Sequence, residues 1–129
     1  MEIKEFIGKK ILNLLVEYCI AGKPGCTVER IYLDLEDVGI VTIPDIDSSS
    51  SETVTRKNGF TLHKDNSQVS GSVVIDVLIS EMLPFYNLLL SNGTLIFCDS
   101  PTPDRFNWYV DHYGENYKNR YEYRSLSEL

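Results

Sequence analysis

The chain has 129 residues, 43% of them hydrophobic, which is enough apolar material for one core, so we expect a single domain over residues 1–129. Twelve basic and 19 acidic residues give a formal net charge of −7, which disfavours direct binding to nucleic acid or to an anionic membrane surface. The odd cysteine count, without paired spacing, argues against a disulfide framework and a zinc site.

The N-terminal segment has the features neither of a signal peptide nor of a membrane span. Its apolar stretch, Ile11 to Ile20, is short and is interrupted by Asn13 and Glu17. We therefore expect a cytoplasmic protein with reduced cysteines.

The first third of the chain predicts a three-stranded meander. Residues 10–18 fit either a strand or a helical face, and we favour the strand because apolar and polar residues alternate there. A Gly/Pro turn at 22–25 leads to a second alternating segment, 28–35, and the β-branched run 40–43 supplies the third strand.

The middle of the chain begins with a polar loop, residues 44–51, which is too poor in apolar side chains to pack. Asn58-Gly59 predicts a hairpin that joins residues 53–55 to residues 60–62. Residues 72–83 then have apolar spacings that favour a short helix ended by Pro84, with a strand over 73–79 as the competing interpretation.

A second hairpin is predicted around Ser91-Asn92-Gly93, between the apolar runs 88–90 and 95–97. Placing Tyr32 on Tyr86 aligns Gly39 with Gly93, so the two hairpin regions share one pattern. This pattern is compatible with an internal duplication and also with the general likeness of antiparallel hairpins.

The C-terminal segment contains a helix-start pattern at Thr102-Pro103-Asp104, which predicts a helix to about Tyr113. After it we expect a mobile or strand-like tail, because residues 121–124 alternate. Its tyrosines fit either the core or a contact surface.

No motif for chemistry occurs. His63 and His112 each lie near an acid, as surface histidines often do, and Asp45 and Asp47 lie in a serine-rich loop without the apolar shielding that would adapt them to acid/base work. We therefore expect no catalytic residue, no metal site and no cofactor.

The negative charge is concentrated in one part of the chain. Between Glu29 and Glu52 there are seven acidic residues and one basic residue, a local balance of −6 out of −7. Carboxylates gathered in this way speed association with a positively charged partner, in a manner that salt weakens.

The segments Phe6-Ile7-Gly8-Lys9-Lys10-Ile11 and Ile31-Tyr32-Leu33-Asp34-Leu35-Glu36-Asp37, followed by Gly39-Ile40-Val41, resemble the small acidic immunity proteins that bacteria encode beside polymorphic or contact-dependent growth-inhibition toxins. The resemblance covers about the first third of the chain. It implies a cytoplasmic protein, not an enzyme, that binds and neutralises a basic toxin domain. It carries over no residue roles, because these proteins share no binding motif.

On this hypothesis the partner-binding residues are five acids and two aromatic anchors: Tyr32, Asp34, Glu36, Asp37, Asp45, Asp47 and Tyr86. The expected partner is a protein, with no nucleic acid and no membrane, and the chain is expected to be a monomer or a weak homodimer. Two alternatives stay open: a structural or oligomerisation module, and a small-ligand-binding domain or enzyme.

The fold class expected from these elements is α+β. It consists mainly of antiparallel sheet, built from two hairpin or meander halves with one or two short helices.

Overall fold

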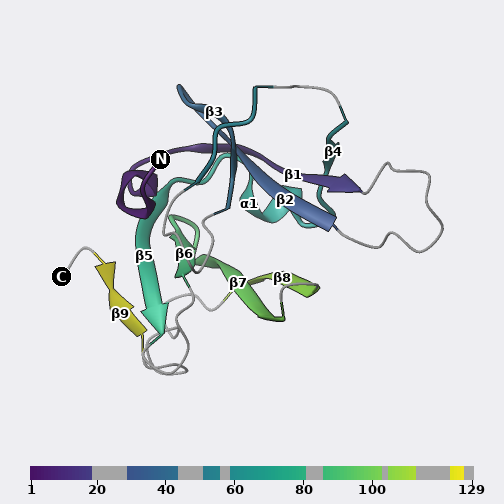
Figure 1. Cartoon of the computed structure of the whole chain (residues 1–129). Helices are drawn as coiled ribbons and strands as arrows, with labels where there is room; N and C mark the ends of the chain where they lie inside the picture. The colour runs from purple at the N-terminus through teal and green to yellow at the C-terminus, as the bar shows by residue number, and fades with distance from the viewer. Residues whose placement is uncertain are drawn as a thin grey trace.

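The structure, a computed structural model, describes residues 1–18, 29–43, 51–55, 59–80, 86–102, 105–112 and 123–126. These residues form two antiparallel sheets, a 3-10 turn η1 (Ile3–Phe6) and a short helix α1 (Asn66–Val69) (Figure 1). The prediction of a mainly antiparallel α+β fold is confirmed.

The first sheet has the order β3-β2-β1-β4. Its strands are β1 (Ile11–Tyr18), β2 (Glu29–Leu35), β3 (Gly39–Thr42) and the two-residue β4 (Thr61–Leu62). Strands β1, β2 and β3 are the predicted meander, in which the alternating pattern directs one set of side chains into the core.

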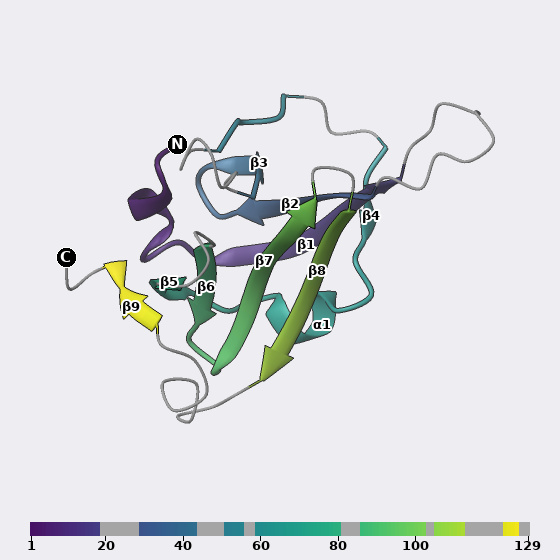
Figure 2. The same cartoon turned by 60° about the horizontal axis from the view of Figure 1, so that its bottom comes forward.

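The second sheet has the order β8-β7-β6-β5-β9. Its strands are β5 (Val74–Ser80), β6 (Tyr86–Leu90), β7 (Thr94–Thr102), β8 (Arg105–His112) and β9 (Tyr123–Ser125). Figure 2 shows β7 and β8 side by side in front of β1 and β2. One row of paired residues crosses all five strands: Tyr109, Phe97, Asn87, Leu78 and Ser125.

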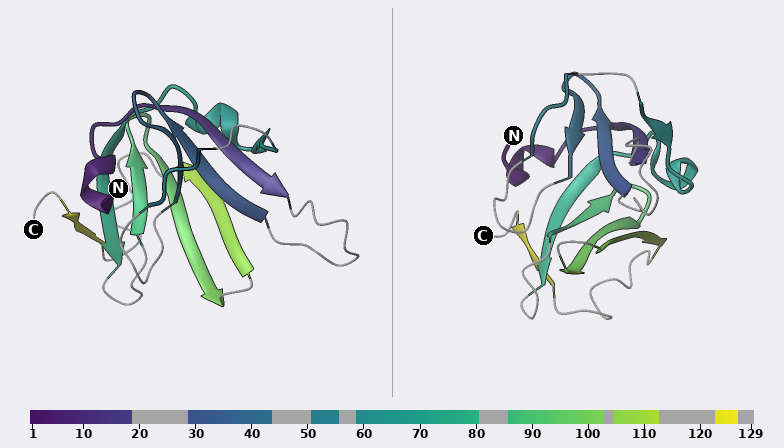
Figure 3. Two further views of the ribbon diagram at one scale, coloured as in Figure 1. Left: turned by 45° about the horizontal axis from the view of Figure 1, so that its top comes forward. Right: turned by 45° about the vertical axis from the view of Figure 1, so that its right-hand side comes forward.

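Both sheets contribute to one hydrophobic core, which lies between them (Figure 3). Leu14, Leu33 and Val41 come from the first sheet and Val77, Leu88 and Ile96 from the second. Phe6 of η1 and Val69 of α1 are fully buried in the same cluster, so both short helical elements close the core.

The sheets are joined where β1 and β5 begin. Lys10 and Val73 form an antiparallel bridge, the amide of Val74 donates to the carbonyl of Lys9 at 2.9 Å, and that of Gly8 donates to Val74 at 2.7 Å. Gly8 has φ +90°, a conformation that glycine adopts without steric cost.

The helix predicted over residues 72–83 is wrong, and the competing strand is correct, since residues 74–80 form β5. Val77 and its neighbour Leu78 are both almost fully buried, so this strand is buried on both faces. A strand of this kind loses its two-residue alternation, and its apolar residues then fit a helical spacing as well.

The helix predicted from Thr102 to Tyr113 is also wrong, because Arg105–His112 is strand β8, paired with β7. Proline and aspartate, which form the helix-start pattern, also favour turns. Here Thr102 of β7 pairs with Arg105 of β8. The strand-like alternative for the tail is confirmed at β9, while Tyr117 and Tyr121 lie outside the described residues.

The hairpin predicted at Asn58-Gly59 is wrong. Thr53 bridges Val41 beside β3, whereas Leu62 pairs with Leu15 of β1, so the two predicted arms lie along opposite edges of the first sheet. The predicted loop at residues 44–51 lies outside the described residues except for Ser51.

The hairpin at Ser91-Asn92-Gly93 is confirmed as β6–β7. Gly93 has φ +85°, while Asn92 is not among the residues with positive φ, so the glycine alone supplies the left-handed position. Leu35 pairs with Gly39 in the first hairpin, but its sequence equivalent Leu89 pairs with Leu95. The two hairpins therefore align in sequence but not in register.

Among the described residues, no helix has the length and apolar character needed to cross a membrane.

Candidate functional site

The candidate site lies at the end of β2 and in the turn that joins it to β3. Antiparallel pairing sets its position: Asp34 lies between Asn13 of β1 and Ile40 of β3, and Leu35 pairs with both Ile11 and Gly39. The register shifts at Leu12, between Ile11 and Asn13, in the manner of a β-bulge.

Three of the predicted acids are brought together here. Glu36 and Asp37 are exposed in the turn, and Asp34 is half-buried on the strand that leads into it. Asp34 lies on the face of the first sheet opposite the main core, because its neighbours Leu33 and Leu35 point into that core.

Asp37 has φ +64°, the left-handed conformation, and it is the one non-glycine residue with positive φ in the described ranges. The amide of Val38 donates to the carbonyl of Leu35 at 3.2 Å and closes a tight turn around it. Asp and Asn tolerate this conformation better than other side chains because they can bond locally to the backbone.

Glu36 is tied to the start of β1 through two contacts with one residue. Its amide donates to the carbonyl of Lys10 at 2.9 Å, and its Oε2 lies 4.0 Å from Lys10 Nζ. The two side chains are about half exposed, 50% and 48%. Lys10 was not among the predicted site residues, because its position beside the acids depends on the β1–β2 register.

Tyr32 does not serve as an exposed anchor, because its side chain is only 3% exposed. Its hydroxyl donates to Glu17 Oε1 at 3.3 Å, and its ring packs edge-to-face against Phe60 with centroids 4.8 Å apart. Tyr32 is therefore a packing residue in this structure, which disfavours the predicted role of an exposed aromatic anchor.

The other predicted residues do not add to this cluster in the described part of the chain. Tyr86 pairs through its backbone with Ile79 in the second sheet, and its side chain is not described. Asp45 and Asp47 lie outside the described residues. The candidate site is thus Asp34, Glu36 and Asp37, with Lys10 beside them.

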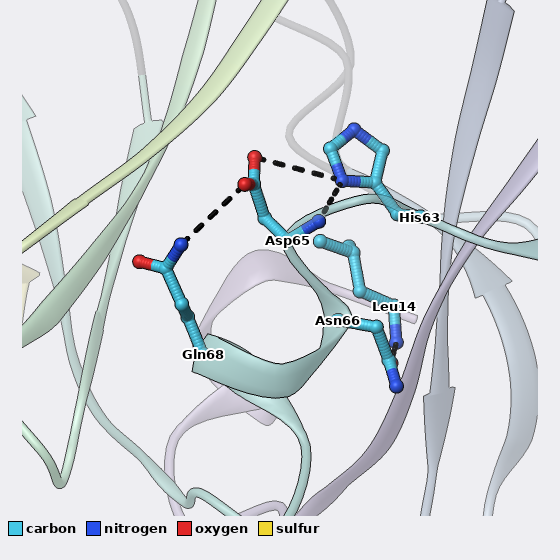
Figure 4. Close-up of polar contacts among 5 residues, drawn as sticks. All are labelled: Leu14, His63, Asp65, Asn66 and Gln68. Atoms are coloured by element: carbon cyan, nitrogen blue, oxygen red, sulfur yellow. Dashed lines mark hydrogen bonds and ion pairs between the residues drawn. The ribbon is translucent and has the colours of Figure 1, made fainter.

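His63 forms a second polar cluster, and it is buried where the sequence suggested a surface histidine. Its Nδ1 accepts a 3.1 Å hydrogen bond from the amide of Asp65 and lies 3.7 Å from Asp65 Oδ2 (Figure 4). Gln68 donates to the other oxygen of Asp65 at 3.4 Å. Because His63 Nδ1 accepts from the backbone amide of Asp65, this cluster stabilises the turn that precedes α1.

No group of three or more histidine, cysteine, aspartate or glutamate side chains in the described ranges is arranged to hold a metal ion.

Comparisons of the chain with protein-family models, with curated proteins and with solved structures found no match.

Proposed function

We propose that the chain is a non-enzymatic binding protein, an immunity protein that neutralises a basic toxin domain in the cytoplasm. The observation that carries the proposal is the pair of exposed carboxylates, Glu36 and Asp37, on the β2–β3 turn, with Asp34 on the adjoining strand. This turn belongs to the segment that holds most of the chain's excess negative charge.

The turn supports such a role because both of its ends are fixed. The amide of Val38 is bonded to Leu35 and that of Glu36 to Lys10, so the backbone that carries the carboxylates is ordered before a partner arrives. Less conformational entropy is then lost on binding, and fixed negative charges steer a basic surface toward the site.

The Lys10–Glu36 ion pair is compatible with exchange for a partner's cation. Pairs as exposed as this one, at 4.0 Å, contribute little to stability, because water screens them. A lysine or arginine of the partner can therefore take the place of Lys10 at a small cost in folding free energy.

A second candidate function is an oligomerisation module, and one observation favours it. Leu62, on the two-residue edge strand β4, is 60% exposed, the largest value among the exposed large hydrophobic side chains described. If this function holds, the chain self-associates in solution and Leu62→Lys abolishes the self-association.

The experiment for the immunity function looks for a toxin gene beside the gene of this protein and uses the toxin domain that it encodes. The two chains are co-expressed, and growth rescue and complex formation are measured, the latter at about 50 and 300 mM salt, where screening lengths differ. We expect rescue and a complex that weakens with salt. Absence of an adjacent toxin gene, or a neighbouring toxin that the chain neither binds nor neutralises, would remove the proposal.

A further inference from the structure

Asn92, in the turn of the β6–β7 hairpin, has both ends of its side-chain amide bonded. Its Nδ2 donates to the carbonyl of Gln68 in α1 at 2.9 Å, and its Oδ1 accepts from the amide of Thr94 at 3.0 Å. One partner is an acceptor and the other a donor, so the two bonds fix the orientation of the amide. Asn92 therefore links the second sheet to α1.

The backbone of this turn is bonded as well. The amide of Gly93 donates to the carbonyl of Leu90 at 3.0 Å, which closes the turn. Ser91 forms two bonds with Val73: its amide donates to the carbonyl of that residue at 2.8 Å, and its Oγ accepts from the amide at 3.0 Å. The turn is thus held against the segment that connects α1 to β5.

The helix α1 depends on contacts of this kind, because a helix of four residues is too short to be stable by itself. Asn66 bonds α1 to β1 of the first sheet (Figure 4), and the carbonyl of Gln68 bonds it to Asn92 of the second. The bond from Asn92 is therefore one of the contacts that link α1 to both sheets.

An exposed asparagine before glycine is prone to deamidation, because glycine has no Cβ and its backbone moves freely. The backbone nitrogen of Gly93 gives its proton to hydroxide and forms a bond to Cγ of Asn92. The bond from Cγ to Nδ2 then breaks, and the nitrogen takes up a proton from water and leaves as ammonia. A water molecule opens the resulting succinimide ring, at one carbonyl or the other, to give aspartate or isoaspartate.

In the closed turn, the three groups that this reaction uses are all engaged. The attacking nitrogen holds its proton in the bond to Leu90, the leaving nitrogen is bonded to Gln68, and Oδ1 is bonded to Thr94. The ring closes only when the side chain and the following peptide turn toward each other, which breaks these bonds. Exposed turns open locally at a lower free energy than the whole fold, so the reaction starts from such an open conformation.

We propose that Asn92 is a deamidation site that reacts only when the hairpin turn separates from α1, and that its product does not re-form the contact. Aspartate at this position keeps an acceptor for the amide of Thr94 but has no donor for Gln68, and it places a carboxylate against a carbonyl. Isoaspartate also lengthens the backbone of the turn by one carbon. This inference is independent of the proposed function.

The first test compares the rate of deamidation at Asn92 in the folded full chain and in a blocked peptide with the sequence of residues 90–95. The chain carries Asn58→Gln, so that its other Asn-Gly pair does not react, and mass spectrometry after digestion locates the product. We expect the folded chain to react about ten to a thousand times more slowly, since each ~1.4 kcal/mol of opening free energy gives a factor of ten. A rate equal to that of the peptide, or one below this range, would overturn the proposal.

Ser91→Ala tests whether opening of the turn controls the rate. It removes the acceptor for the amide of Val73 and leaves Asn92-Gly93 unchanged. The same substitution in the peptide is the matched control. The ratio of the folded rate to the peptide rate should rise a few-fold for Ser91→Ala, because one bond that holds the turn is lost. An unchanged ratio would show that the reaction does not depend on this opening.

Asn92→Asp tests the consequence of the modification. Amide hydrogen exchange is measured at about 0.5 M salt, which screens the added charge. Protection of the amides of Ser91 and Gly93, relative to their intrinsic exchange rates, should fall at least a few-fold, because the bond to Gln68 is absent. Protection equal to that of the parent chain would show that the product keeps the contact, and would contradict the proposal.

Discussion

Asn66 of α1 accepts, through Oδ1, a 2.7 Å hydrogen bond from the backbone amide of Leu14 in β1 (Figure 4). Other contacts continue along the same edge: the carbonyl of Leu14 accepts from the amide of His63 at 2.9 Å, and that of Leu12 accepts from Ser70 Oγ at 2.7 Å. Two side chains and one backbone amide thus complete an edge that β4 pairs over only two residues, which protects β1 from pairing with another chain.

Asn66→Ala should lower the free energy of unfolding by about 1–3 kcal/mol, because it leaves a part-buried amide without its acceptor. Asn66→Asp retains an acceptor oxygen and should recover much of this loss. The measurement is urea unfolding, with the exposed neighbour Ser67→Ala as control. An Asn66→Ala variant within about 0.5 kcal/mol of the parent would contradict the role given to this bond.

Asp37 should respond to substitution according to its backbone conformation. Asp37→Ala should lower the free energy of unfolding by about 1 kcal/mol, because alanine is strained at φ +64°, while Asp37→Asn should stay within about 0.5 kcal/mol. Glu36→Ala, in the same turn but without a positive φ, is the control. Equal unfolding free energies for the Ala and Asn variants at 37 would show that the turn is not left-handed there.

Lys10 should oppose binding of a basic partner while contributing little to stability. Lys10→Gln removes the counter-charge of Glu36, so the association rate with the toxin domain should rise a few-fold at low salt. The free energy of unfolding should change by less than about 1 kcal/mol. Lys4→Gln, an exposed lysine on η1, is the matched control in stopped-flow measurements. A slower association for Lys10→Gln would argue that Lys10 itself contacts the partner.

Tyr32 should matter for folding and not for binding. Tyr32→Phe removes the hydroxyl that bonds to Glu17 and should cost about 1–2 kcal/mol of unfolding free energy, with unchanged affinity for the partner. A double-mutant cycle with Phe60→Leu should give a coupling of about 0.5–1.5 kcal/mol for the ring contact. Lost affinity with unaltered stability would restore Tyr32 as a contact residue.

The part of the fold that the sequence predicted is the part where polar residues interrupt the apolar ones. In β1 and β2 the face opposite the main core is also partly buried, at Leu15, Glu17 and Tyr32, but it carries Asn13, Glu17 and Asp34, so alternation still marked both strands. In β5, Val77 and Leu78 are both buried, and the pattern no longer distinguished a strand from a helix. Asp34, Glu36 and Asp37 could be located from the sequence because they lie in β2 or directly after it. The position of Lys10 and the burial of Tyr32 depend on long-range strand pairing, which local sequence patterns do not contain.

The most direct test of the binding proposal is the affinity of two matched double variants for the toxin domain, measured by calorimetry at low salt. Glu36→Gln with Asp37→Asn removes two exposed charges from the turn. Glu2→Gln with Glu5→Gln removes one from η1 and one from its N-cap residue while keeping an acceptor for the amide of Glu2. We predict about tenfold weaker binding, equivalent to 1.4 kcal/mol, for the turn variant and less than about twofold for the η1 variant. Equal losses, or a loss confined to the η1 variant, would contradict the assignment of the β2–β3 turn as the binding site.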